Sequence, residues 1–145
     1  MVDKYVFESE IINLNKELEI VNLVINKKRL NGLDSIEIHG AALSLATLYN
    51  GIERVLVLIL IDKSGPLKEN SKWHVELLKK AVEAGIISHD LYNELKKFLG
   101  FRHFIRHAYS FEINPATIEA VLDVTPGLTT TFIGEIRDYL EKKER

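Results

Sequence analysis

Cysteine is absent from the 145 residues of the chain. Its absence excludes disulfide bonds, thiolate metal sites and cysteine nucleophiles, and it fits a reducing environment, so we expect a cytoplasmic protein. A strong charge of one sign is also absent, because 19 lysine and arginine residues nearly balance 21 aspartate and glutamate residues. With a formal net charge of -2, the chain as a whole does not attract phosphate, so any binding of nucleic acid needs a local basic patch.

Long hydrophobic segments are missing as well. The longest apolar run, Val55 to Ile61, has seven residues, whereas a membrane-spanning helix needs about 20. The stretch after Met1 has no uninterrupted apolar region of the kind found in signal peptides. We therefore expect no membrane segment and no secretion signal, and we assign the apolar run to a core or an interface.

The composition is typical of one globular domain, with 46% hydrophobic and 28% charged residues in a chain of domain length. Apolar residues at three- and four-residue steps, with capping and breaking residues, predict helices over residues 4–29, 35–62, 71–84 and 88–111. A last helical region runs from 115 to the carboxyl terminus, interrupted near Thr125-Pro126-Gly127. The sequence thus predicts an all-α fold, a bundle of five or six helices in one domain spanning residues 1–145.

The segment from Arg54 to Asp62 is ambiguous, because a continuous apolar run also suits the central strand of an α/β sheet. We favour a helix, since residues 41–48 are rich in alanine and leucine and no glycine-rich turn follows, although Gly51 weakens the prediction. Glu53 and Arg54 lie in an otherwise apolar stretch, where unpaired charges are costly, so we expect them to be paired or to face the interface cleft, and we favour a structural ion pair. A helix that is apolar on nearly all sides must be covered on all sides, and we expect a partner subunit to contribute to that cover.

Side chains that can do chemistry gather in the segment Phe101-Arg-His-Phe-Ile-Arg-His-Ala-Tyr109. Arginine supplies a fixed fork of donors for phosphate oxygens. Histidine titrates near neutral pH and can move a proton at a ribose hydroxyl or a leaving oxygen. The segment therefore suits cleavage of a phosphodiester such as RNA without a metal.

The geometry of a regular helix separates these groups. At about 100° per residue, Arg102, Arg106 and Tyr109 share one face, which continues an apolar stripe from earlier in the same helix. His107 lies about 140° around the helix from Arg102, so the two cannot hold one phosphate from the same side. They can meet if the helix loosens near Ala108, or if a two-fold dimer brings two copies of the set together.

Two other interpretations of the segment stay open. Arg102 and Arg106 can be structural, paired with acidic residues of their own or a neighbouring helix, with the histidines half-buried. His103 and His107, spaced i to i+4, can hold a metal with Glu112 as a remote third ligand. We disfavour the metal site because no acidic residue lies inside the segment, and no residue of the chain demands a cofactor.

The string Arg102-x4-His107-x-Tyr109 resembles the signature of HEPN-domain proteins, in particular the HepT-like toxins of prokaryotic toxin-antitoxin pairs. The resemblance covers nearly the whole chain, with Tyr49-Asn-Gly-Ile-Glu-Arg54 in the second predicted helix and Trp73-His74 opening the third. In the commonest pattern of that family, Asn or Asp follows the arginine and an apolar residue precedes the histidine. Here His103 and Arg106 occupy those two places, and both add potential positive charge.

The resemblance implies a dimeric, metal-independent endoribonuclease toxin, with Arg102 and His107 of both subunits lining a cleft at the interface. We add His103 and Arg106 as auxiliary RNA-binding residues. Tyr109 matches the tyrosine that a partner nucleotidyltransferase antitoxin, of the MntA type, adenylylates to silence the toxin. Attached AMP would add negative charge and bulk where the RNA phosphate should lie. The alternative is a non-catalytic HEPN-type helical dimer that holds a nucleotidyltransferase.

Overall fold

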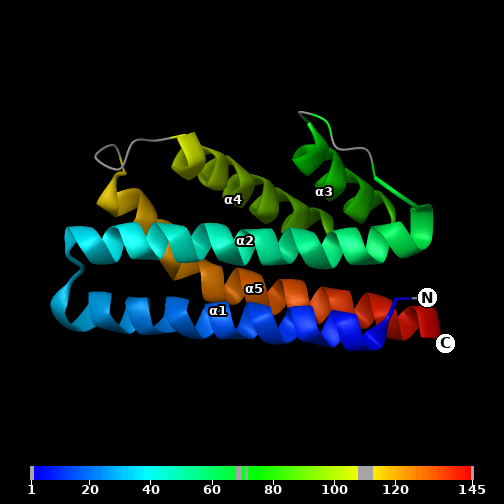
Figure 1. Cartoon of the computed structure of the whole chain (residues 1–145), viewed down its shortest axis with the longest axis horizontal. Helices are drawn as coiled ribbons and strands as arrows, with labels where there is room; N and C mark the ends of the chain where they lie inside the picture. Colours follow the sequence, from blue (N-terminus) through cyan, green and yellow to red (C-terminus); the bar gives the residue numbers. More distant parts are fainter. Residues whose placement is uncertain (1, 68–69, 71, 108–112, 145) are drawn as a thin grey trace.

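A computed structural model describes residues 2–67, 70, 72–107 and 113–144 of the chain. Over these residues the fold consists of five α-helices and no strand, which confirms the predicted all-α class (Figure 1). The helices are α1 (Lys4–Asn31), α2 (Ser35–Ser64), α3 (Trp73–Glu83), α4 (His89–His107) and α5 (Pro115–Glu144).

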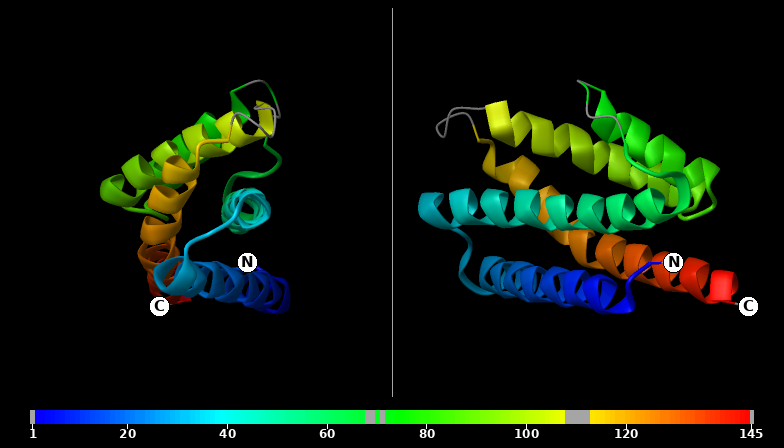
Figure 2. Two further views of the ribbon diagram at one scale, coloured as in Figure 1. Left: turned by 90° about the vertical axis from the view of Figure 1, so that its left-hand side faces the viewer. Right: turned by 45° about the vertical axis from the view of Figure 1, so that its right-hand side comes forward.

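The three long helices α1, α2 and α5 run side by side, and the shorter α3 and α4 lie together along α2 on the side away from α1 (Figures 1 and 2). α2 contacts each of the other four helices, so it forms the centre of the packing. Both chain termini lie at the end of the bundle where α2 finishes, and the described end of α4 lies toward the opposite end (Figure 1).

Local signals in the sequence account for the two ends of α2. The Asp34 carboxylate accepts a hydrogen bond from the Glu37 backbone N–H, and the Glu37 side chain accepts one from the Asp34 N–H, which forms a capping box. At the other end Gly65 adopts a φ of 78°, which favours glycine, and its N–H bonds to the carbonyl oxygen of Ile61. The helix therefore runs through residues 54–62, and the strand alternative is excluded.

The apolar composition of α2 reflects its central place. By length and composition alone α2 is sufficient to cross a membrane, but 61% of its most apolar window is buried inside the bundle. Val55, Leu56, Ile59 and Leu60 are all buried by the surrounding helices, as expected of a core helix. Packing within the bundle thus explains the apolar run.

The predicted break near Pro126 is wrong, because α5 is continuous from Pro115 to Glu144. A proline inside a helix removes one backbone hydrogen bond and costs about 3 kcal/mol. Buried residues on both sides of it, Leu122 and Phe132, fasten α5 into the core, so tertiary packing outweighs the local penalty. The predicted cap at Ser71 and the predicted extension of the fourth helix to Phe111 lie outside the described residues.

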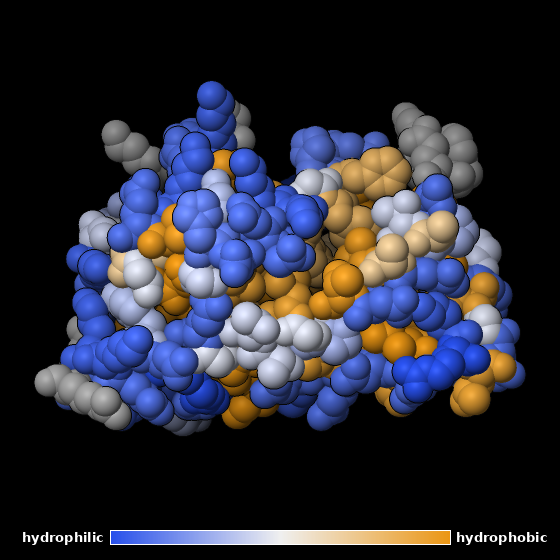
Figure 3. Space-filling model, turned by 180° about the vertical axis from the view of Figure 1, so that it is seen from behind, coloured by the Kyte–Doolittle hydropathy of each residue, from blue (hydrophilic) through white to orange (hydrophobic). Residues whose placement is uncertain are grey.

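The packing leaves part of α2 uncovered. In the left view of Figure 2 one side of α2 has no other helix against it, and Ile36, Leu43 and Ile61 are exposed apolar residues of α2. Seen from behind, hydrophilic side chains cover much of the surface and apolar ones show in its middle (Figure 3). Some apolar surface therefore remains open on the isolated chain.

At Gly51, α2 packs tightly against α1. A Cβ atom built on Gly51 would lie 2.8 Å from Cδ2 of Leu14, which is buried. Glycine is therefore required here by the space between two helices, and the helix propensity that it lacks is compensated by close packing.

We predict that Gly51→Ala lowers the free energy of unfolding by about 1–3 kcal/mol, because the new methyl group displaces Leu14 in a filled core. Gly134→Ala in α5 is the matched control, since no atom lies within 4 Å of its added Cβ. That substitution should stabilise by about 0.5–1 kcal/mol through helix propensity. Urea denaturation measures both, and equal stabilisation of the two variants would contradict the packing argument.

Candidate functional site

The apolar stripe of α4 ends in a guanidinium group, as the spacing predicts. Leu91, Leu95 and Phe98 are buried, and Arg102, one turn further on, has only 9% of its surface exposed. Its Nε donates a hydrogen bond to Oδ1 of Asn50 in α2 at 2.7 Å. The arginine is thus fixed against α2 by a side-chain amide, and no acidic partner is recorded for it among the described residues.

The other predicted residues of α4 lie on the surface. His103, Arg106 and His107 are exposed, so the half-buried interpretation of the histidines is wrong. The two imidazole rings lie with their centroids 4.4 Å apart, which shows that they share a helix face. Arg106 and His107 also occupy the last described turn of α4, where positive charge favours the helix dipole.

α4 is helical through His107, so Arg102 and His107 leave it in directions about 140° apart. Arg102 packs against α2 whereas His107 is exposed, and a single subunit therefore does not bring the two together on one side. The predicted loosening near Ala108 and the predicted modification site Tyr109 lie outside the described residues.

A second buried polar group lies next to Asn50 on α2. The Glu53 carboxylate is buried, and its Oε2 accepts a hydrogen bond from Nδ1 of His74 at 2.7 Å. The predicted pairing of Glu53 is confirmed, and its partner is a histidine of α3. His74 is partly exposed, and the ring of Trp73 lies 4.6 Å from it between centroids.

The phenol of Tyr49 lies within the electrostatic influence of both polar groups. Tyr49 is fully buried, and its ring stacks on Phe98 with centroids 5.5 Å apart. Burial raises the pKa of the Tyr49 hydroxyl far above its usual range, the negative charge of Glu53 raises it further, and the positive charge of Arg102 acts in the opposite direction. The charges of Glu53 and Arg102 thus both act on Tyr49. These residues, with Asn50 and His74, form one electrostatic cluster around Arg102.

Two members of this cluster were not identified from the sequence as functional. Asn50 stands inside the Tyr49–Arg54 segment, and its only signal is an amide in a largely apolar helix. His74 stood out in the sequence only as part of the Trp73-His74 pair that opens the third helix, and its contact with Glu53 is a tertiary one. Pairing between α2, α3 and α4 depends on tertiary contacts that helical periodicity does not reveal.

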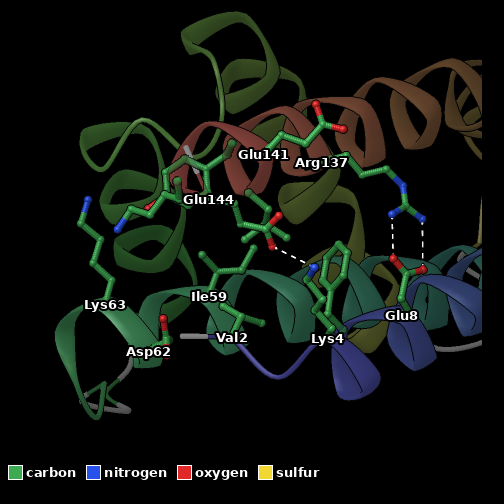
Figure 4. A pocket seen from close by; sticks show the side chains of 13 residues that line it. Val2, Lys4, Glu8, Ile59, Asp62, Lys63, Arg137, Glu141 and Glu144 are labelled. Atoms are coloured by element: carbon green, nitrogen blue, oxygen red, sulfur yellow. Dashed lines mark hydrogen bonds and ion pairs between the residues drawn. The ribbon is translucent and has the colours of Figure 1, made fainter.

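Over the described residues, neither a metal centre nor the pocket shown in Figure 4 involves the candidate residues of α4. Over the described residues no three His, Asp or Glu side chains gather as a metal site would require. A pocket of about 420 Å³ lies at the end of the bundle that holds the termini, lined partly by Phe7, Ile59 and Leu140 (Figure 4). Ion pairs of Lys4 with Glu144 and of Glu8 with Arg137 connect α1 to α5 there, and the second lowers the pKa of Glu8.

Comparisons with known proteins identify a family and a relative. The profile of a family described as HepT-like protein matches residues 40–143, well over half of the chain. A protein of Archaeoglobus fulgidus named "Putative RNase" is 28% identical over 109 residues, which cover 75% of this chain and 79% of the relative. No solved structure is significantly similar to the chain. The region matched by the profile contains every residue of the cluster around Arg102.

We predict that Asn50→Ala lowers the free energy of unfolding by about 1–3 kcal/mol, because the buried Nε of Arg102 loses its acceptor. Asn50→Asp should lose less, since a carboxylate oxygen can replace the amide oxygen and accepts more strongly from a cation. Asn93→Ala on the exposed side of α4 serves as the control and should change stability by less than about 0.5 kcal/mol. If Asn50→Ala unfolds like the wild type, the hydrogen bond does not hold Arg102.

Proposed function

The chain belongs to the HepT-like protein family, and on that premise we propose that it is a metal-independent endoribonuclease whose active site forms between two copies of the chain. The name of the Archaeoglobus fulgidus relative supports a ribonuclease. The observation that carries the proposal is the position of Arg102, a buried arginine whose only recorded hydrogen-bond partner among the described residues is a neutral amide.

A guanidinium group held in this way keeps its positive charge available. Asn50 fixes its Nε and does not neutralise it, so the terminal nitrogens can bind a phosphate group. In the proposed site Arg102 orients the scissile phosphate and stabilises the charge that develops on it, and His107 transfers a proton. His103 and Arg106, both exposed beside His107, contribute further contacts to the RNA backbone.

The uncovered side of α2 supports the dimer. Its residues follow one another at alternating steps of four and three, the spacing of a seam between two packed helices. These residues are Ile36, Gly40, Leu43, Thr47, Asn50, Arg54, Val57 and Ile61, all exposed or partly exposed. We propose that this stripe, which we call the α2 seam, packs against the α2 seam of a second copy.

A two-fold axis through the middle of the α2 seam would pass between Thr47 and Asn50. The two α2 helices would then run antiparallel, with Ile36 of one copy near Ile61 of the other. The two Asn50 side chains would lie about 4.5 Å apart along the helix axis, at 1.5 Å per residue. Each Asn50 holds an Arg102, so this dimer brings both arginines and residues of both copies to one cleft.

The exposed apolar residues of α1 make a weaker candidate for the interface. Ile12 and Leu23 share a face of that helix, but Lys16 and Glu19 are exposed between them on the same face. Charged residues are disfavoured at the centre of an interface. The α1 face carries two of them, whereas Arg54 is the one charged residue of the α2 seam.

Regulation by a partner enzyme forms the rest of the proposal. We propose that a cognate nucleotidyltransferase of the MntA type adenylylates Tyr109, which silences the ribonuclease as in a toxin-antitoxin pair in the cytoplasm. Tyr109 follows His107 by two residues, so the added phosphate would lie next to the basic end of α4 and compete with RNA.

A non-catalytic binding module is the second candidate function. The deep burial of Arg102 favours it, because an arginine packed between helices also serves as a structural residue. Under this alternative the helical dimer holds a nucleotidyltransferase, and substitution of Arg102 changes stability alone.

We predict that the purified protein cleaves single-stranded RNA in the presence of EDTA. Arg102→Ala should lower the rate by about 10²–10³-fold through loss of charge stabilisation, and His107→Ala by about 10²–10⁴-fold through loss of proton transfer. Arg29→Ala and His89→Ala, at exposed positions outside the cluster, are the matched controls and should leave cleavage unchanged. Absence of cleavage by the wild type would support the binding module.

We also predict that Leu43→Asp converts the dimer to a monomer and abolishes cleavage, because a carboxylate within the α2 seam must be buried unpaired. Leu23→Asp on α1 is the control, with 68% of the residue surface exposed against 69% for Leu43. It should remain dimeric and active. Sedimentation and RNA cleavage measure the two properties, and a monomeric wild type would contradict the shared site.

A further inference from the structure

Cleavage of RNA without a metal requires two proton transfers. The 2′-hydroxyl must lose a proton as its oxygen attacks phosphorus, and the 5′-oxygen of the leaving nucleotide must gain one. His107 supplies one of these transfers in the proposed function, on which this inference rests. A second titratable group should therefore lie near Arg102.

A buried carboxylate holds the side chain of His74 in one orientation. Nδ1 of His74 lies 2.7 Å from Oε2 of Glu53, and the carboxylate has only 6% of its side chain exposed. An ionised carboxylate accepts hydrogen bonds only, so Nδ1 carries the proton. Nε2 is then the nitrogen with a free lone pair, and the imidazole is accessible to a ligand because a quarter of the side chain is exposed.

α2 anchors both His74 and Arg102. Asn50 holds the guanidinium and Glu53 holds the imidazole, and these two anchors are three residues apart, which corresponds to about 4.5 Å along the helix. The buried Tyr49 feels the charges of both Glu53 and Arg102, so the two anchored groups belong to one neighbourhood. That separation is comparable with the size of a single phosphodiester group.

We propose that His74 is the general base of the Arg102 site, with Glu53 as its positioning residue. Nε2 of His74 takes the proton of the 2′-hydroxyl, and the 2′-oxygen forms a bond to phosphorus. The bond from phosphorus to the 5′-oxygen breaks, and that oxygen receives a proton from the imidazolium of His107 of the second copy. The products are a 2′,3′-cyclic phosphate and a 5′-hydroxyl, and the two histidines exchange protonation states.

The carboxylate favours this direction of transfer. Glu53 stabilises the imidazolium that forms when Nε2 accepts a proton, and it keeps the ring in one tautomer. The indole of Trp73 packs on the same imidazole, which restricts the ring further. Both contacts arise from α2 and α3, so the base is fixed independently of the exposed end of α4.

His74→Asn separates catalysis from folding. The asparagine amide can take the place of Nδ1–H and donate to Glu53, but nothing replaces Nε2. We expect this variant to keep the melting temperature of the wild type within a few degrees and to lose cleavage by about 10²-fold or more. His74→Gln places an amide near Nε2 and provides a second, independent removal of the base, and His89→Asn is the control.

A modified substrate distinguishes the base from the acid. In an RNA with sulfur in place of the 5′-bridging oxygen, the leaving thiolate needs no proton, so loss of the general acid is rescued and loss of the base is not. His107→Ala should therefore regain most of the wild-type rate on this RNA, while His74→Asn and His74→Gln should stay about 10²-fold slower.

Three results would overturn the proposal. Wild-type rates for both His74 variants would make the histidine a structural partner of Glu53. Rescue of the His74 variants by sulfur would make it the general acid. If the wild type cleaves neither RNA, the proposed ribonuclease function is wrong. This failure is distinct from failure of the His74 proposal, because it is measured on the wild type alone.

Discussion

The burial of α2 is the constraint on which the structure depends. Four helices pack on it, so a polar side chain on its covered sides needs a partner from a neighbouring helix. Those partners come from three directions. Ser44 bonds to Glu17 of α1, Asn50 accepts from Arg102 of α4, and Glu53 accepts from His74 of α3. The polar groups of α2 therefore specify which helix lies against which side of it.

The same constraint explains why candidate functional groups lie where they do. An arginine in the middle of an apolar helix interface is costly unless its donors are satisfied, and Asn50 satisfies one without cancelling the charge. Glu53 is also costly when buried, and the hydrogen bond with His74 offsets part of that cost. Stability alone would be served better by apolar residues at these places. Under the proposed function, these residues are present because they act on a charged substrate.

The sequence was sufficient to predict the helices because local signals specify them. Apolar spacing, the caps at Asp34 and Asn114 and the glycine at position 65 all act within a few residues of where they stand. The break predicted at Pro126 was wrong because tertiary contacts outweigh a local signal there. The effect of the proline is local and unfavourable, but the helix around it is held by contacts with α1, α2 and α4 that are distant in the sequence.

The candidate site could be predicted only as far as one helix contains it. The stripe that leads from Leu91 to Arg102 and the shared face of His103 and His107 follow from helical geometry. Asn50 and His74 belong to the same cluster through pairings across 52 and 21 residues, which no periodicity encodes. The division has a functional consequence. The end of α4 can vary its exposed charges without disturbing the core, whereas the groups anchored on α2 are fixed by the packing that also folds the chain. Under the proposed function, substitutions at the end of α4 therefore change substrate preference, and substitutions of the groups anchored on α2 change the chemical step.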